Sequence, residues 1–182
     1  MIMLPLPYLF GALLIGLAIW ARRFWDANPW LALYLAWFAM QEILIGTRFG
    51  YGLDALSLVQ PITAAAIPPL AYLAFRAPKI ELRLLRFTLP ILIIIAAMIF
   101  NRYTVDALLA LNNLIFSGAL ILLALRGAEA LSWAPFQFIA PLRLLLWLSV
   151  LNLLISGTVD GLITLDFLLG DCAKRGIGYD AG

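Results

Sequence analysis

The chain has 182 residues, of which 65% are hydrophobic and only 12% are charged. Soluble domains have about half of their residues apolar and about a quarter charged, so this composition excludes a soluble globular protein and predicts one that faces lipid. There is no His, and Cys172 is the single cysteine, which excludes His-ligated metal sites, Ser-His-Asp triads and intrachain disulfides. The net charge of +2 is too small for a nucleic-acid surface, so we expect no metal, no cofactor and no nucleic-acid contact.

Six runs of the sequence approach the roughly 20 apolar residues that a helix needs to cross a bilayer. In chain order they are 4–21, 29–47, 54–75, 86–101, 104–125 and 142–168. The fourth run is short, and the sixth is long enough to tilt or to end in a turn after Gly157 or Gly161. The sequence therefore predicts an all-α, polytopic integral membrane bundle of about six transmembrane helices at 1–170, followed by a flexible polar tail at 171–182.

Basic residues are unevenly distributed over the segments between these runs. One set of alternate segments holds Arg22, Arg23, Arg76, Lys79, Arg83, Arg86, Arg126 and Arg143. The other set holds Arg48, Arg102, Lys174 and Arg175. Because Lys and Arg are enriched in cytoplasmic segments, we predict that the N-terminus is outside and that the 76–86 loop is cytoplasmic. The segment 127–143, which carries Trp133, Phe136 and Phe138, is predicted to lie at the membrane interface.

Acidic and amide side chains at membrane depth are costly, and they therefore indicate a functional site. With the predicted orientation, these side chains gather in the outer halves of the spans, whereas the inner halves are mostly Leu, Ile and Ala. The candidate ligand-binding residues are Glu42, Gln60, Asn113 and Asp160. We predict that they line a polar cavity on the extracytoplasmic side that takes a small polar or cationic ligand.

Each of these polar groups also has a structural interpretation. Carboxylates near the span ends can lie among the lipid headgroups: Asp54, Asp106 and Asp166. Glu42 can pair with Arg48 or Arg102. Amide side chains can form interhelical hydrogen bonds that contribute about 0.6 kcal/mol each, and the candidates are Asn112, Asn113 and Asn152. Small residues such as those at 64–66 favour close helix packing within the chain, with a homodimer face as the alternative.

The stretch "LVQPITAAAIPPLAYLAF", residues 58–75, places three prolines in the predicted third span. A proline removes one backbone N–H, and in lipid the carbonyl that loses its partner needs another donor. The candidate donors within the span are Ser57, Gln60 and Thr63. Pro61 costs little if the helix starts near Gln60. Pro68 and Pro69 should bend the helix and form the candidate hinge, with a static kink as the alternative.

Two stretches, "LSLVQPITAAAIPPLAYLAFRAP" and "SGTVDGLITLDFLLG", resemble the membrane-embedded N-terminal module of bacterial AraC-type transcriptional regulators. The likeness runs from about residue 30 to 170. In that family a multi-helix membrane module precedes a cytoplasmic helix-turn-helix domain, which requires an odd number of spans when the N-terminus is outside. This chain has six predicted spans and no helix-turn-helix pattern. The resemblance therefore implies a sensor portion in the bacterial inner membrane without the DNA-binding domain.

The function that the sequence favours is a non-enzymatic membrane sensor. Ligand binding in the cavity would shift helix packing at Pro68 and Pro69 and would move the 76–86 loop. The alternatives are a small transporter or channel subunit and a structural subunit of a membrane complex. A transporter predicts polar residues through the whole membrane depth, which the apolar inner halves do not provide. An enzyme is not expected, because only isolated carboxylates are available.

Overall fold

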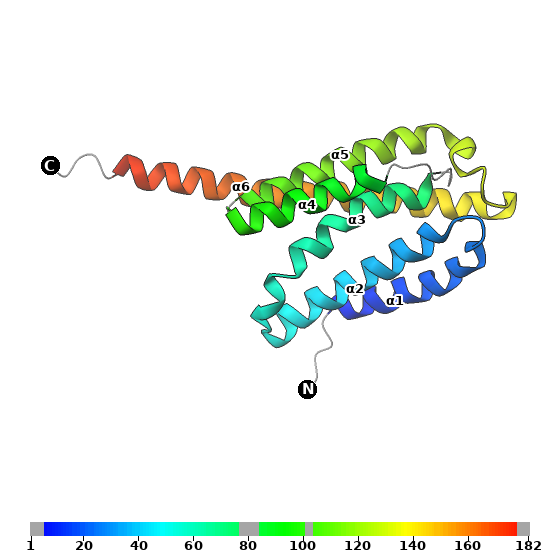
Figure 1. The fold of residues 1–182 in the computed structure, drawn as a ribbon, viewed down its shortest axis with the longest axis horizontal. Coiled ribbons are helices and arrows are strands. Elements are labelled where there is room, and N and C mark those ends of the chain that lie inside the picture. The colour runs from blue at the N-terminus through cyan, green and yellow to red at the C-terminus, as the bar shows by residue number, and fades with distance from the viewer. Residues whose placement is uncertain (1–5, 77–83, 101–103, 178–182) are drawn as a thin grey trace.

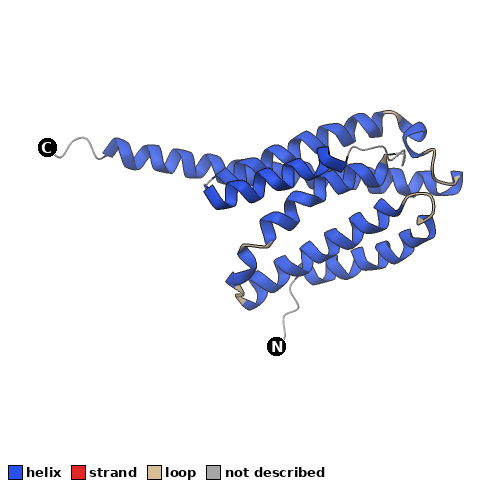
Figure 2. Ribbon diagram, viewed as in Figure 1, coloured by secondary structure: helices blue, strands red, loops and turns tan. Residues whose placement is uncertain are grey.

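The computed structural model describes residues 6–76, 84–100 and 104–177, and within these ranges all regular structure is helical, with no strand (Figure 2). The described ranges contain six α-helices: α1 (Leu6–Ala21), α2 (Pro29–Tyr51), α3 (Gln60–Phe75), α4 (Leu84–Phe100), α5 (Val105–Leu125) and α6 (Ile139–Ile177). The short 3-10 helices are Arg22–Phe24, Asp54–Ser57, Gly127–Leu131 and Phe136–Phe138. The prediction of an all-α chain is confirmed.

Among the residues that the structure describes, four helical stretches are long and apolar enough to cross a membrane. They are Leu6–Phe24, Pro29–Tyr51, Val105–Leu125 and Phe136–Asp166. Large apolar side chains cover their outer faces, as Leu9, Leu122 and Leu162 do with more than half of their surface exposed. Four such helices indicate a multi-pass membrane protein. The other two helices are shorter, with 16 residues in α3 and 17 in α4, so six spans and the orientation of the N-terminus stay predictions.

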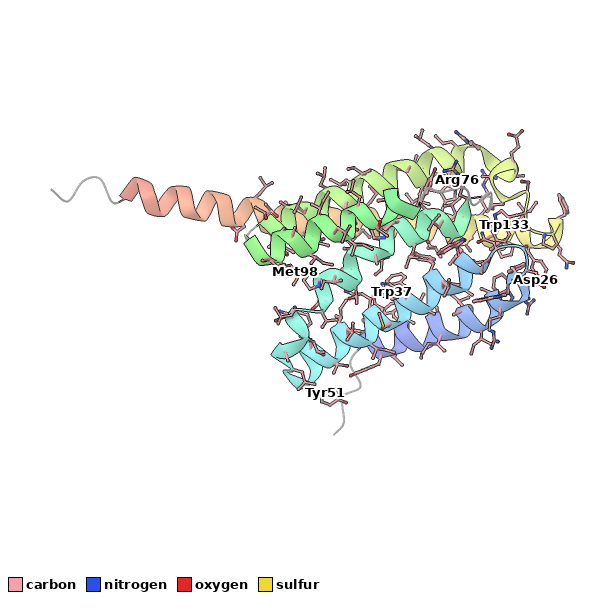
Figure 3. All side chains as sticks on the ribbon, in the orientation of Figure 1. Asp26, Trp37, Tyr51, Arg76, Met98 and Trp133 are labelled. Carbon is pink, nitrogen blue, oxygen red and sulfur yellow. The ribbon has the colours of Figure 1, made fainter. Side chains whose placement is uncertain are left out.

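Two helix pairs and a diagonal helix form the bundle (Figure 1). α1 packs along α2, α5 packs along α6, and α3 lies between the two pairs, in contact with α2 and α5. α4 packs on α3 and α5. Because the chain reverses after each helix, Asp26, Arg76 and Trp133 lie together at one end of the bundle, away from Tyr51 (Figure 3). We call the end with Arg76 the basic end, and the end with Tyr51 the polar end.

At the polar end, the end of α2 and the start of α3 differ from the helix boundaries that the sequence predicts. α2 continues four residues past the predicted end at 47 and stops at Tyr51. The next residue, Gly52, has φ of 69°, a left-handed conformation that favours glycine and ends the helix. The third helix starts at Gln60 instead of 54, because Pro61 occupies its first turn, where the missing N–H has no helical partner to lose.

Of the two alternatives for the sixth run, a tilt or a turn after Gly157 or Gly161, the turn is wrong, because α6 runs through both glycines without a break. Gly157 allows α6 to pack closely on α5. A Cβ atom at this position would lie 3.1 Å from the Cβ of Asn113 and 3.4 Å from the carbonyl oxygen of Ala110. The glycine is therefore explained by close helix approach.

α6 has 39 residues, or about 58 Å at 1.5 Å per residue, and its C-terminal part projects beyond the other helices (Figure 1). It continues into the segment 171–182, for which the sequence predicted a flexible polar tail, as far as Ile177. Residues 178–182 lie outside the described ranges.

Aromatic side chains fill the core at the basic end. The ring of Phe24 makes edge-to-face contacts with Trp20, Trp133 and Phe138 at centroid distances of 5.2, 6.0 and 5.1 Å. Trp133 and Phe138 belong to the segment 127–143 that was predicted to be interfacial, and this segment forms two short 3-10 helices between α5 and α6. Phe136 of the same segment is 90% exposed. The ring contacts around Phe24 therefore fill the basic end of the bundle with apolar side chains.

Both Pro68 and Pro69 are buried inside α3, which continues through them. Since Pro69 has no N–H, the carbonyl of Ala65, four residues earlier, loses its helical partner. The side-chain amide of Asn112 on α5 donates to this carbonyl oxygen at 3.0 Å. The donor is thus supplied by a neighbouring helix and not by the predicted residues Ser57, Gln60 and Thr63. The interhelical role expected for Asn112 is confirmed.

A second side chain holds the other end of α3. Asn28 is fully buried at the basic end. Its Oδ1 accepts from the backbone N–H of Trp30 at 3.2 Å, which caps the N-terminus of α2. Its Nδ2 donates at 2.8 Å to the carbonyl of Ala74, in the last turn of α3. One amide therefore satisfies the ends of two helices, and the position of α3 is tied to the start of α2.

Candidate functional site

The four predicted ligand-binding residues line one cavity in the polar half of the bundle. Glu42 comes from α2, Gln60 from α3, Asn113 from α5 and Asp160 from α6. The cavity has a volume of about 360 Å³, which is enough for a small organic molecule or a few waters. Geometry thus confirms that these residues meet. That they bind a ligand stays a prediction.

Helical spacing explains why so many polar groups reach the cavity. On α6, Asn152, Ser156 and Asp160 recur every four residues and lie on one face. On α5, Asp106 and Asn113 are two turns apart on one face. Antiparallel neighbours bring these faces to the same depth.

Hydrogen bonds connect the walls of the cavity. The amide of Asn113 donates to a carboxylate oxygen of Asp160 at 3.3 Å, which links α5 to α6. The guanidinium of Arg48 donates to the side-chain oxygen of Gln60 at 2.6 Å, which links α2 to the start of α3. The Thr63 hydroxyl bonds to the side-chain oxygen of Gln41 close by. The walls are therefore fixed in position by side-chain contacts between helices.

The charge of the cavity is dominated by carboxylates. Glu42, Asp106 and Asp160 are each half-buried at its surface, whereas Arg48 is the one basic residue that lines it within the described ranges. Asp106 of α5 and Asp160 of α6 both line this one cavity, together with Glu42. With all four groups ionised the cavity carries two excess negative charges, which favours a cation.

The structural interpretation of Glu42 as a partner of Arg48 is wrong. Arg48 donates to Gln60 instead, and its Cζ lies 5.0 Å from the ring centroid of Phe49. Within the described ranges Glu42 has no hydrogen bond and no ion pair, so its carboxylate faces the cavity without a protein partner. The other proposed partner, Arg102, lies outside those ranges.

The candidate ligand-binding residues did not include two charged residues that line the cavity, Asp106 and Arg48. Asp106 was placed in the outer half of its span, with the lipid headgroups as its structural interpretation, and Arg48 was considered only as a partner of Glu42. The signal for Asp106 was its spacing of seven residues from Asn113, which places both on one helix face. Asp166, in contrast, is exposed and does not line the cavity. The side chain of Asp54 is not among those that the structure describes.

Fold and cavity together define a multi-pass helical membrane protein with an acidic polar cavity at one end of the bundle. Comparisons of the chain with protein-family models, curated proteins and solved structures give no match. The resemblance to the membrane module of AraC-type regulators therefore stays a prediction. The chemistry of the cavity is the basis for assigning a function.

Proposed function

We propose that this protein is a non-enzymatic membrane sensor that binds a small cationic ligand in the cavity between α2, α3, α5 and α6. The observation that carries the proposal is the excess of half-buried carboxylates over the one arginine that lines the cavity among the described residues. Negative charges held together in a low-dielectric site repel each other, and a bound cation removes this repulsion. The uncharged polar groups around them, such as Asn152 and Ser156, provide hydrogen-bond partners for a polar ligand.

The proposed topology places the cavity on the extracytoplasmic side of a bacterial inner membrane. In this arrangement all six helices cross the bilayer, the N-terminus is outside, and the basic end faces the cytoplasm. The basic end includes Arg22, Arg76 and Arg126, at the ends of α1, α3 and α5, in agreement with the enrichment of basic residues in cytoplasmic segments. A ligand would thus enter from outside.

We propose that α3 carries the signal across the membrane. Its first residue, Gln60, lines the cavity, and its last, Phe75, lies at the basic end next to the predicted cytoplasmic loop 76–86. Pro68 and Pro69 lie between these ends and form the hinge of the proposal. The protein then acts as the membrane portion of a regulator of the AraC type.

Binding without transport is favoured by the packing at the basic end. The aromatic contacts around Phe24 and the buried leucines Leu131 and Leu142 fill this half of the bundle. The buried polar side chains described there, such as Asn28 and Tyr34, are hydrogen-bonded within the protein, and they do not line the polar cavity. A channel or transporter would need a polar path across the apolar half. The sensor therefore explains the one-sided cavity better than a transporter does.

The test is cation binding to the full chain in lipid nanodiscs, measured by calorimetry with choline, putrescine and tetraethylammonium, and with acetate as an anionic control. We expect at least one of the cations to bind and acetate not to bind. Combining Glu42→Gln with Asp160→Asn should weaken cation binding at least tenfold, a change of about 1.4 kcal/mol. Asp26→Asn, which removes an exposed carboxylate at the basic end, should leave the affinity unchanged.

Three results would count against the proposal. If no cation binds, or if acetate binds as well as the cations, the charge argument fails. If the double variant folds, as judged by its helicity and elution volume, and retains wild-type affinity, the cavity is not the site. If the protein in proteoliposomes releases the bound cation to the other side, it is a transporter and not a sensor.

A further inference from the structure

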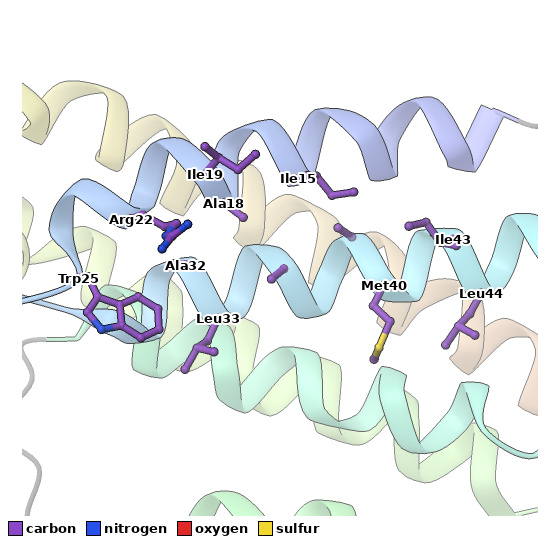
Figure 4. Close-up of a pocket in the computed structure, with 12 residues that line it drawn as sticks. Ile15, Ala18, Ile19, Arg22, Trp25, Ala32, Leu33, Met40, Ile43 and Leu44 are labelled. Carbon is purple, nitrogen blue, oxygen red and sulfur yellow. The ribbon is translucent and has the colours of Figure 1, made fainter.

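A second concave surface lies outside the polar cavity, between α1 and α2 (Figure 4). It has a volume of about 460 Å³, and almost all of its lining is apolar. Its walls include Ile15, Ala18 and Ile19 of α1 and Ala32, Ala36 and Met40 of α2. We call this surface the α1–α2 groove.

The groove follows the axis of the helices. Along α2 its lining extends from Ala32 to Leu44, a distance of about 18 Å at 1.5 Å per residue. The groove is deep where its lining side chains are small, as at Ala36, and the exposed side chains of Ile19 and Leu33 form its sides. Both helices belong to stretches long enough to cross a membrane, and α1 is the least buried of the four. A long, narrow, apolar surface of this kind fits a flexible hydrocarbon chain.

The basic end of the groove carries a charge. Arg22 follows the last residue of α1 and lines the groove together with Trp25 (Figure 4). Arg22 is exposed, and within the described ranges its side chain makes no hydrogen bond, ion pair or ring contact, including with Asp26. Its neighbour Arg23 differs, because it donates to the carbonyl of Trp20 at 3.1 Å and lies over two aromatic rings. Arg22 is thus free to bind an anion at the level where headgroups lie.

We propose that the α1–α2 groove binds an anionic phospholipid, with one acyl chain along the apolar floor and the headgroup phosphate at Arg22. A guanidinium offers paired N–H donors to phosphate oxygens, and arginine and tryptophan are typical of the membrane interface. Charge complementarity favours a lipid over a second copy of the chain. In a dimer with its twofold axis along the membrane normal, the two copies of Arg22 would meet at the same depth and repel each other.

The experiment is native mass spectrometry of the full chain after partial delipidation, with phosphatidylglycerol and phosphatidylcholine of identical acyl chains. The wild type should retain more phosphatidylglycerol than phosphatidylcholine. Arg22→Gln should lower phosphatidylglycerol retention about fivefold, the effect of one basic residue at an anionic lipid. Arg143→Gln removes another exposed arginine at the basic end and should change nothing. Ala36→Phe places a ring in the groove at an exposed position and should reduce the retention of both lipids.

Several outcomes would overturn the inference. Equal retention of the two lipids by the wild type would show that the charge does not select the ligand. Equal losses in Arg22→Gln and Arg143→Gln would show that general surface charge is responsible. Full retention of lipid by Ala36→Phe would show that the acyl chain lies elsewhere. A dimer that cross-links through cysteines introduced at Ala36 would identify the occupant as a second copy.

Discussion

Replacing Asn112 by alanine should destabilise the bundle by removing the donor to the carbonyl of Ala65. The Asn112 side chain is 7% exposed, and its Nδ2 lies 3.0 Å from that oxygen. In most helices the carbonyl would keep a backbone partner four residues later. Here residue 69 is proline, so the carbonyl loses its helical donor and depends on Asn112.

The magnitude follows from two known ranges. Interhelical hydrogen bonds in membrane proteins contribute about 0.6 kcal/mol on average and up to about 1.7 kcal/mol. Leaving a buried polar group without a partner costs about 1–3 kcal/mol. Because the oxygen of Ala65 has no second donor from its own helix, the cost of Asn112→Ala should lie near the top of the membrane range, at about 1–2 kcal/mol.

A double-mutant cycle with Pro69→Ala separates this effect from general loss of packing. Pro69→Ala restores a backbone N–H that can donate to Ala65, so Asn112→Ala should cost less in this background. We expect a coupling energy of about 1 kcal/mol between the two changes. The free energy of unfolding would be measured for all four proteins by titrating the detergent-solubilised chain with SDS and following helicity and tryptophan fluorescence.

Asn113 provides the matched control, because it is the same residue type one position later. Its amide donates to Asp160 and not to α3. Asn113→Ala and Pro69→Ala should therefore be additive within about 0.3–0.5 kcal/mol. If the coupling of Asn112 with Pro69 is no larger than that of Asn113 with Pro69, Asn112 does not compensate for the proline, and the reasoning is refuted.

Two further predictions concern helix ends and helix approach. Asn28→Ser keeps an acceptor for the N–H of Trp30 but loses the donor to Ala74, so it should cost about 1 kcal/mol, whereas Asn28→Ala loses both and should cost about 2 kcal/mol in the same SDS titration; equal costs would show that the cap to Trp30 contributes nothing. Gly157→Val should destabilise by about 2 kcal/mol, because even a Cβ atom there lies 3.1 Å from Asn113. Gly161→Val, with nothing within 4 Å of the added Cβ, should change stability by less than about 0.5 kcal/mol, and similar effects of the two valines would contradict the packing explanation.

The grouping of polar residues could be predicted because it depends on depth alone. Successive helices run in opposite directions, and their predicted lengths place Glu42, Gln60 and Asp160 in the same half of the bundle. This placement does not depend on which helices lie next to one another. Their meeting in a single cavity additionally requires that α2, α3, α5 and α6 surround it. The hydrophobic pattern of a membrane helix contains little information on this point, since lipid-facing and buried faces are both apolar.

Individual partners could not be predicted for the same reason. The structural interpretation of Glu42 gave Arg48 or Arg102 as its partner, yet Arg48 donates to Gln60 on the next helix. A turn after Gly157 or Gly161 was one of two alternatives for the sixth run, beside a tilt, and only the proximity of α5 shows that Gly157 serves close packing. In both cases the interpretation used the local sequence, whereas the contact is determined by a neighbouring helix.

The donors to α3 constrain how the proposed sensor could move. Trp37 donates to the carbonyl of Thr63 at 2.9 Å and Asn112 to that of Ala65, both on the cavity side of the prolines, while Asn28 holds Ala74 on the basic side. A bend at the two prolines can change the angle between these halves without breaking any of the three bonds. A sliding of α3 along its axis would break all of them. If α3 transmits ligand binding, the motion is therefore a hinge between residues 65 and 74, and variants that loosen Asn28 should uncouple the basic end while leaving cation affinity intact.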